Sequence, residues 1–333
     1  MNQKTLLEIE NLKTHFNTDR GKVTAVDNVS FHIKEGEILG IVGESGSGKS
    51  VTIKSILRLF DEKKLANYEG NILFNGENIF NLSETKMRDI RGNKISMIFQ
   101  DPLSSLDPLY TIGNQIVEAI MLHQNLSKKK SYEKAIELLK LTGIPDPEKR
   151  VNNFPHELSG GMKQRAMIAI ALSCQPSILI ADEPTTALDV TTQAQILKLI
   201  TDLNKEFQMS VIFISHDLDV ISEICDRVAV MYLGQIVEET NVEKVFSTPL
   251  HPYTKGLLKA IPQIDGERAN CLHVIEGSMP SLQVVQHGCK FASRCSFADQ
   301  KCKEQQPDFK KSNFDSKHKV RCWHYEEIAL KEE

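Results

Sequence analysis

The stretch ILGIVGESGSGKS, residues 38–50, decides the fold. It opens with an apolar run of strand length and continues into G-x-x-x-x-G-K-[S/T], which it matches at every fixed position. After it, Ile53, Ile56, Leu57 and Phe60 recur with the spacing of one helix face. A buried strand, a glycine-rich loop and a helix in this order predict a loop that binds nucleotide phosphates.

Each part of this phosphate loop has an expected role. The glycines let consecutive backbone N–H groups converge on phosphate oxygens, and the helix N-terminus adds partial positive charge. Lys49 is expected to contact the β- and γ-phosphates, and the Ser50 hydroxyl is expected to ligate Mg²⁺. The residues predicted to bind ATP here are Gly43, Glu44, Ser45, Gly46, Ser47, Gly48, Lys49 and Ser50.

The surrounding sequence predicts an α/β fold with a mixed sheet. The apolar runs Ile178–Ala181 and Val211–Ile214 are typical of buried parallel strands. The alternation of Val29, Phe31 and Ile33 indicates a half-buried strand, and Asn75-Gly76 indicates a hairpin turn, so an antiparallel β subdomain is expected as well.

Two further segments depart from this pattern. Residues 101–158 lack strand patterning and predict a helical insertion, with helices at 112–122 and 132–141 and a lysine-rich turn at 128–130. Near residue 250 prolines, cysteines and lysines accumulate and periodicity fades. We therefore expect an ATP-binding domain over residues 1–250 and a small cysteine-containing C-terminal extension over residues 251–333.

A pair of adjacent carboxylates complements the phosphate loop. Asp182 and Glu183 end the apolar run that starts at Ile178. A strand beside the phosphate-loop strand would deliver Asp182 to the Mg²⁺ shell, directly or through water. Glu183 would then polarise the attacking water, which makes it the predicted catalytic carboxylate, with Lys49 as a further catalytic candidate.

Residues 158–165, LSGGMKQR, open a predicted helix and resemble the signature of the ATP-binding-cassette superfamily. Ser159, Gly160 and Gly161 would form a second anion-binding helix N-terminus. One chain cannot easily direct two such N-termini at one nucleotide. The resemblance implies that two cassettes pair head to tail, and that each signature caps the ATP held by the partner's phosphate loop.

Other landmarks of this family occur in the family's order. Gln100 resembles the glutamine that touches Mg²⁺ and links to the transmembrane subunits, which with Ser50 and Asp182 completes the implied Mg²⁺ set. Residues 187–189, Ala-Leu-Asp, resemble the loop that crosses between cassettes, which implicates Asp189. His216 resembles the histidine that contacts the γ-phosphate, which makes it the third catalytic candidate. Phe16 resembles the aromatic residue that stacks on adenine, although a core phenylalanine is the alternative.

Two longer stretches are more specific. QDPLSSLDP at 100–108 and HPYTKGLL at 251–258 resemble the ATP-binding subunits of bacterial oligopeptide/dipeptide importers over essentially the whole chain. The resemblance implies a second ATP-binding subunit, two transmembrane permease subunits and an extracytoplasmic substrate-binding protein. It also places the chain on the cytoplasmic face of the membrane, held there through the permeases. Import of nickel or another small solute is the alternative, followed by a soluble ATPase without transport.

Five of the seven cysteines lie in the last quarter of the chain. Without a secretion signal, such a cluster favours metal ligation over disulfides. The spacing lacks the short C-x₂-C steps of ferredoxins and zinc ribbons, so the residues alone indicate only four thiolates available to one metal site. An iron–sulfur cluster, zinc and free thiols are the alternatives. In related importer subunits these cysteines are similar to the ligands of a [4Fe–4S] cluster, here Cys289, Cys295, Cys302 and Cys322, and Cys271 is left unassigned.

The bulk composition limits the remaining classes. The formal net charge of −4 gives no overall field that would attract nucleic acid, so no nucleic-acid partner is expected. No stretch approaches the roughly 18 apolar residues that span a bilayer, and the N-terminus has no signal-peptide core. Work at a membrane would therefore depend on partner subunits.

Overall fold

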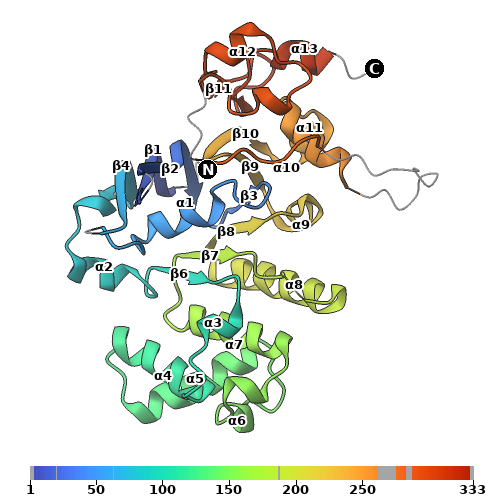
Figure 1. Ribbon diagram of the computed structural model, residues 1–333. Helices are drawn as coiled ribbons and strands as arrows, with labels where there is room; N and C mark the ends of the chain where they lie inside the picture. Colours follow the sequence, from blue (N-terminus) through green and yellow to red (C-terminus); the bar gives the residue numbers. More distant parts are fainter. Residues whose placement is uncertain are drawn as a thin grey trace. The chain divides into compact units, whose positions relative to one another are not determined.

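The computed structural model describes residues 4–19, 21–62, 64–186, 188–261, 275–282 and 287–330. Two residues singled out in the sequence, Ala187 and Cys271, lie outside these ranges. The chain divides into two compact units (Figure 1). Unit 1 comprises residues 1–4, 34–37 and 81–214, and unit 2 comprises residues 5–33, 38–80 and 215–333.

Unit 2 contains the phosphate-loop strand and an antiparallel sheet of order β2-β1-β4-β5. Strand β3 pairs in parallel with β9, and β9, β10, β12 and β11 continue antiparallel, so this part of the sheet is mixed. Its elements are β1 (Thr5–Thr18), β2 (Gly21–Lys34), β3 (Ile38–Val42), α1 (Lys49–Ile56), β4 (Ala66–Phe74), β5 (Glu77–Asn78), α9 (Leu218–Ile224), β9 (Arg227–Tyr232), β10 (Gln235–Asn241), α10 (Val242–Ser247), α11 (Pro252–Lys259), the 3₁₀ helix η3 (Ala292–Arg294), α12 (Gln300–Glu304), β11 (Lys310–Lys311), β12 (Lys319–Val320) and α13 (Tyr325–Leu330).

Unit 1 contains three parallel strands in the order β6-β7-β8 and a cluster of helices (Figure 1). Every residue of the three strands is buried, as expected of parallel strands covered on both faces. Its elements are α2 (Glu84–Ile90), β6 (Ile95–Ile98), α3 (Pro102–Ser105), α4 (Ile112–His123), α5 (Lys128–Leu141), α6 (Pro147–Arg150), η2 (Pro155–Glu157), α7 (Gly160–Leu172), β7 (Ile178–Asp182), α8 (Val190–Phe207) and β8 (Ser210–Ser215).

The structure confirms the α/β fold with its antiparallel sheet and helical insertion, and it corrects two local predictions. The residues 128–130, predicted as a turn, are the first turn of α5, because the Ser127 side chain accepts a hydrogen bond from the Lys130 amide and caps the helix. Phe60 does not belong to the helix after the phosphate loop. That helix ends at Ile56, and Arg58 has a left-handed backbone with φ 49°.

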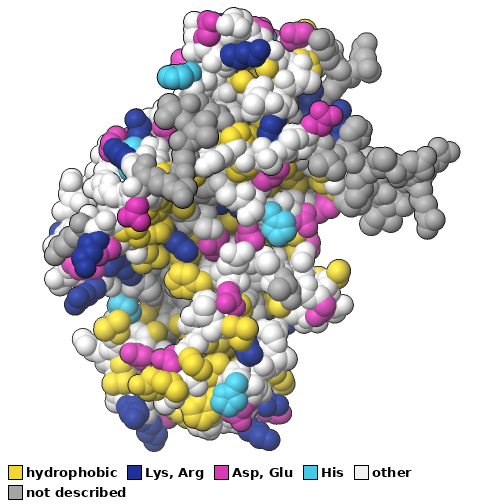
Figure 2. Space-filling model, viewed as in Figure 1, with side chains coloured by type: hydrophobic (Ala, Val, Ile, Leu, Met, Phe, Trp, Pro, Cys, Tyr) yellow, Lys and Arg dark blue, Asp and Glu magenta, His cyan; other side chains and the backbone are white. Residues whose placement is uncertain are grey.

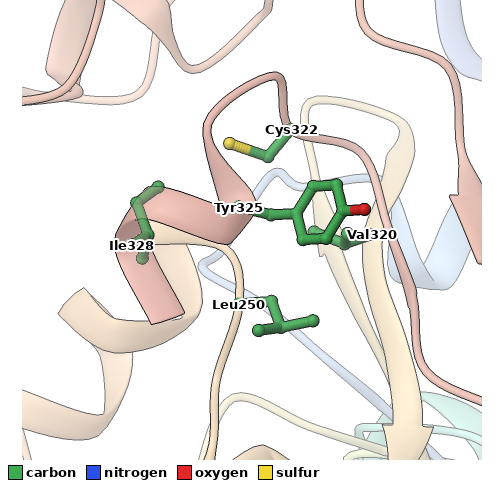
Figure 3. Close-up of a cluster of buried hydrophobic side chains, with 5 residues drawn as sticks. All are labelled: Leu250, Val320, Cys322, Tyr325 and Ile328. Atoms are coloured by element: carbon green, nitrogen blue, oxygen red, sulfur yellow. The ribbon is translucent and has the colours of Figure 1, made fainter. Parts of the chain in front are cut away.

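The C-terminal extension has a small core of its own (Figure 3). Leu250, directly before the extension, packs with Val320 of β12, Cys322, and Tyr325 and Ile328 of α13. Burial of these side chains stabilises the extension by the hydrophobic effect. No helix among the described residues has the length and apolar character needed to cross a membrane.

Candidate nucleotide site and cysteine site

The phosphate loop follows β3, whose five residues are all buried. A Cβ atom at Gly43 would overlap the Met231 carbonyl oxygen, and one at Gly48 would lie 2.9 Å from the Ala25 carbonyl oxygen. Gly48, the N-cap of α1, also has φ +103°, a conformation that other residues rarely adopt. These two glycines are therefore required by close backbone packing, which agrees with the sequence pattern.

Lys49 is held inside the loop. Its side chain is 4% exposed, and Nζ donates to the Gly43 carbonyl at 2.6 Å and to the Glu44 carbonyl at 3.1 Å. The Glu44 amide in turn donates to the Tyr253 hydroxyl at 2.8 Å. The ammonium group thus lies over the loop backbone, where a bound phosphate would meet it.

Phe16 lies beside the phosphate loop. It lines one pocket with Ser45 and Gly46 of the loop and with residues 279–282 of the C-terminal extension. Its ring also contacts Phe60 edge to face, with the ring centroids 4.9 Å apart. An aromatic ring on the wall of a pocket next to the phosphate loop is placed to contact a nucleotide base.

In unit 1 the structure brings Gln100 and Glu183 together. They follow the adjacent parallel strands β6 and β7, and Gln100 Nε2 donates to Glu183 Oε2 at 3.0 Å. Thr186 Oγ1 donates to the same oxygen at 3.1 Å. Glu183 itself has a left-handed backbone with φ 48°, and its amide donates to the Ile214 carbonyl. The carboxylate is therefore oriented by two donors and by its own backbone.

Three other predicted site residues occupy strand or helix ends in unit 1. Asp182 ends β7 and is 2% exposed. Ser159 caps α7, and its side chain accepts a hydrogen bond from the Met162 amide, with Gly160 and Gly161 in the first turn. Asp189 caps α8, and hydrogen bonds from the amide and hydroxyl of Thr192 lower the pKa of its carboxyl group.

His216 follows β8 and is exposed. It belongs to unit 2, as do the phosphate loop and Phe16. Unit 1 holds the other predicted site residues: Gln100, Asp182, Glu183, Asp189 and the start of α7 with Ser159. The roles assigned to these residues stay predictions.

The four cysteines predicted to form one site line a single cavity. Cys289, Cys295, Cys302 and Cys322 share it with His251, Trp323 and other residues, and none of the four is in a disulfide. A backbone hydrogen bond joins two of these residues, because the Cys289 amide donates to the Cys302 carbonyl at 2.7 Å. Burial, reinforced by the neighbouring cysteines, raises the pKa of Cys289 to about 11 and that of Cys322 to about 12.

A second set of potential ligands overlaps this cavity, because Cys302 and His324 belong to its lining. The carboxylate of Asp299, Sγ of Cys302 and a ring nitrogen of His324 all lie within 4.8 Å of one another. His324 Nε2 is 3.2 Å from Asp299 Oδ2, and the Cys302 amide donates to Asp299 Oδ1. Asp299 thus acts as the N-cap of α12 and lies within ion-pair distance of the histidine.

Comparison with known proteins decides the family. Residues 26–186 match the model of the ABC transporter family, and residues 237–302 match that of the oligopeptide/dipeptide transporter C-terminal region. An oligopeptide transport ATP-binding protein of Bacillus subtilis is 50% identical over 323 residues, which cover 97% of this chain and 98% of the relative. The chain belongs to the ABC transporter family.

Two further ABC proteins support this assignment. A second oligopeptide transport ATP-binding protein of Bacillus subtilis is 50% identical over 96% of this chain and 88% of its own length. Among solved structures, the ATP-binding cassette MJ0796, a dimer in a post-hydrolysis state bound to ADP and phosphate, is similar with a TM-score of 0.64. It is 30% identical and is matched over 71% of this chain and 99% of its own. The fold of this ABC protein is thus that of an ATP-binding cassette.

Sequence reasoning missed three contributions of the extension to the nucleotide site. These are the Tyr253 hydroxyl on the loop amide, the ion pair of Arg294 with Glu44, and the pocket wall at 279–282. Tyr253 lies in the HPYTKGLL stretch, which signals the family and gives no role to this side chain. Arg294 and Glu44 are 250 residues apart, so no local pattern could pair them.

Proposed function

We propose that this chain is the ATP-hydrolysing subunit that powers peptide uptake through a multi-subunit ABC importer. The hydrogen bond from Gln100 to Glu183 supports the proposal, because the predicted catalytic carboxylate accepts it from the side chain predicted to contact Mg²⁺. The relatives named for oligopeptide transport and the match of the C-terminal region support the choice of di- or oligopeptides.

In this proposal the phosphate loop and Phe16 bind ATP, and Ser50, Gln100 and Asp182 bind Mg²⁺. Glu183 polarises the attacking water, while Lys49 and His216 stabilise charge on the γ-phosphate. Ser159, Gly160, Gly161 and Asp189 contact the nucleotide of a second ATP-binding subunit paired head to tail. The dimeric state of the similar solved cassette supports this pairing.

Two permease subunits and an extracytoplasmic binding protein complete the proposed importer, with this chain on the cytoplasmic face of the membrane. Exposed apolar side chains after Gln100 support contact with a permease. Leu103, Leu109 and Tyr110 are 68%, 79% and 55% exposed. Figure 2 shows hydrophobic side chains gathered over the helical part of unit 1, and such patches mark interaction sites.

Co-purification and transport test the function. A tagged chain is expected to bring down two polytopic membrane proteins and a second ATP-binding subunit from membranes. In liposomes that assembly, with the binding protein added on the opposite side of the membrane, should import peptides when ATP is supplied on the side of this chain. Uptake of Ni²⁺ without uptake of peptides would show that nickel is the transported solute. An ATPase that brings down no membrane protein would contradict the role in import.

We further propose that the four cysteines bind a structural [4Fe–4S] cluster. Four unpaired sulfur ligands around one cavity fit such a group, which would cross-link the extension through four iron–thiolate bonds. Lys301 on α12 adds positive charge near the Cys302 thiol. Zinc bound by Asp299, Cys302 and His324 is the second candidate, because their ligand atoms lie close together.

Metal analysis separates these candidates. Protein purified without oxygen is expected to be brown and to contain iron and acid-labile sulfide. The Cys322→Ser variant should lose most of both, whereas Cys174→Ser, a cysteine of unit 1, should keep them. Zinc that disappears in His324→Ala would favour the second set of ligands, and colourless protein free of both metals would contradict a metal site.

A further inference from the structure

Arg294 connects the extension to the phosphate loop. It ends η3 and directly precedes Cys295. Its Nη1 and Nη2 donate to the two carboxylate oxygens of Glu44 at 2.7 Å and 3.1 Å. The side chain of Arg294 is 4% exposed and that of Glu44 is 32% exposed. The arginine end of this bidentate pair is therefore largely desolvated. Such forks fix geometry as well as charge.

The same guanidinium holds the segment that forms the pocket wall. Nε donates to the Glu276 carbonyl at 3.0 Å, and Nη2 donates to the Ile275 carbonyl at 3.3 Å. A few residues later the chain reaches Met279, whose Sδ would lie 3.8 Å from a Cβ atom at Gly46. Arg294 therefore touches both the loop and the chain that leads into the pocket beside Phe16.

Aromatic rings also contact the Arg294 guanidinium, and one of the tyrosines among them binds the phosphate loop. The guanidinium carbon lies 5.9 Å and 6.0 Å from the ring centroids of Tyr232 and Phe291, within the range of cation–π attraction. Tyr253, which packs among these rings, accepts the hydrogen bond from the Glu44 amide. Glu44 is thus held at its amide and at its carboxylate by two residues of the extension.

The charge of Glu44 explains why it needs a partner. A carboxylate in a loop that binds phosphates repels the anionic ligand, and partial burial strengthens the repulsion. Arg294 cancels this charge and ties the carboxylate to the extension. We propose that Arg294 is a positioning residue for the phosphate loop, through which the C-terminal extension sets the affinity of the chain for MgATP.

Titration of the purified full-length chain with Mg²⁺ and a non-hydrolysable ATP analogue tests this inference. Arg294→Ala is expected to raise Kd for the analogue about tenfold, a usual size for coupling between sites. In a Glu44→Gln background the same substitution should change Kd by less than about twofold, because no carboxylate is then left without a partner. Arg294→Lys, which keeps the charge and loses the fork, should lie between wild type and alanine.

Lys310→Ala is the matched control, since this cation lies over the Tyr325 ring within the extension, and the Kd of this variant should equal that of wild type. Equal losses with and without the Glu44→Gln substitution would overturn the inference, because Arg294 would then affect Kd independently of the Glu44 carboxylate. An unchanged Kd in Arg294→Ala would overturn it too. If the alanine variant fails to fold, the Arg294→Lys comparison in both backgrounds decides. A wild-type chain that binds no nucleotide would instead refute the proposed ATPase.

Discussion

Glu183→Gln is expected to lower the ATP turnover rate by about 10²–10⁴-fold, the usual contribution of a general base. Glutamine keeps the shape of the side chain, and its amide oxygen can still accept the bonds from Gln100 and Thr186 that reach Oε2. What it loses is the ability to take a proton from water. Phosphate release measures the rate, and the variant should retain unhydrolysed ATP on a filter after the wild type has released ADP.

Glu206→Gln is the matched control for this experiment. Glu206 is an exposed glutamate near the end of α8 in the same unit, and its substitution should leave turnover unchanged. Turnover near the wild-type rate in Glu183→Gln would mean that another group activates the water. Loss of ATP binding together with turnover would point to a structural role for the carboxylate.

The parts of the site that continuous segments encode could be predicted from sequence. Strand β3 (Ile38–Val42) is the apolar run predicted to open residues 38–50, and a run that ends at a glycine loop leaves little choice of strand bounds. The hairpin at Asn75-Gly76 also forms as predicted, with both residues at positive φ and Phe74 paired with Glu77. In these places local conformation and burial favour the same structure.

Prediction is weaker where the deciding contact is small or distant. The lysines at 128–130 have no apolar face, so the helix start that the Ser127 cap provides does not stand out in the sequence. Strands β9 and β10 were not predicted, because their turn uses Leu233 at φ 43° before Gly234, and leucine is rare at such a position. The Glu44–Arg294 pair depends on the tertiary fold alone.

Gly160→Asp is expected to lower ATP hydrolysis by the assembled complex about 10²–10³-fold, comparable to the loss of one transition-state donor. In the proposed dimer, Gly160 at the start of α7 faces the γ-phosphate bound by the partner subunit. A carboxylate there would repel the phosphate and block closure of the dimer. Hydrolysis by the purified complex, at saturating ATP, gives the rate.

The same substitution should leave the isolated chain intact, which separates a defect between subunits from misfolding. A Cβ atom at Gly160 meets no heavy atom within 4 Å beyond its own helix and chain neighbours, whereas one at Gly161 would lie 2.9 Å from Thr192 Cγ2. An aspartate in the first turn also interacts favourably with the helix dipole, so the unfolding temperature should be unchanged or slightly raised. ATP binding to the isolated chain should match wild type, because its own phosphate loop is unaltered. Normal hydrolysis by the complex would show that this helix does not cap a partner's nucleotide.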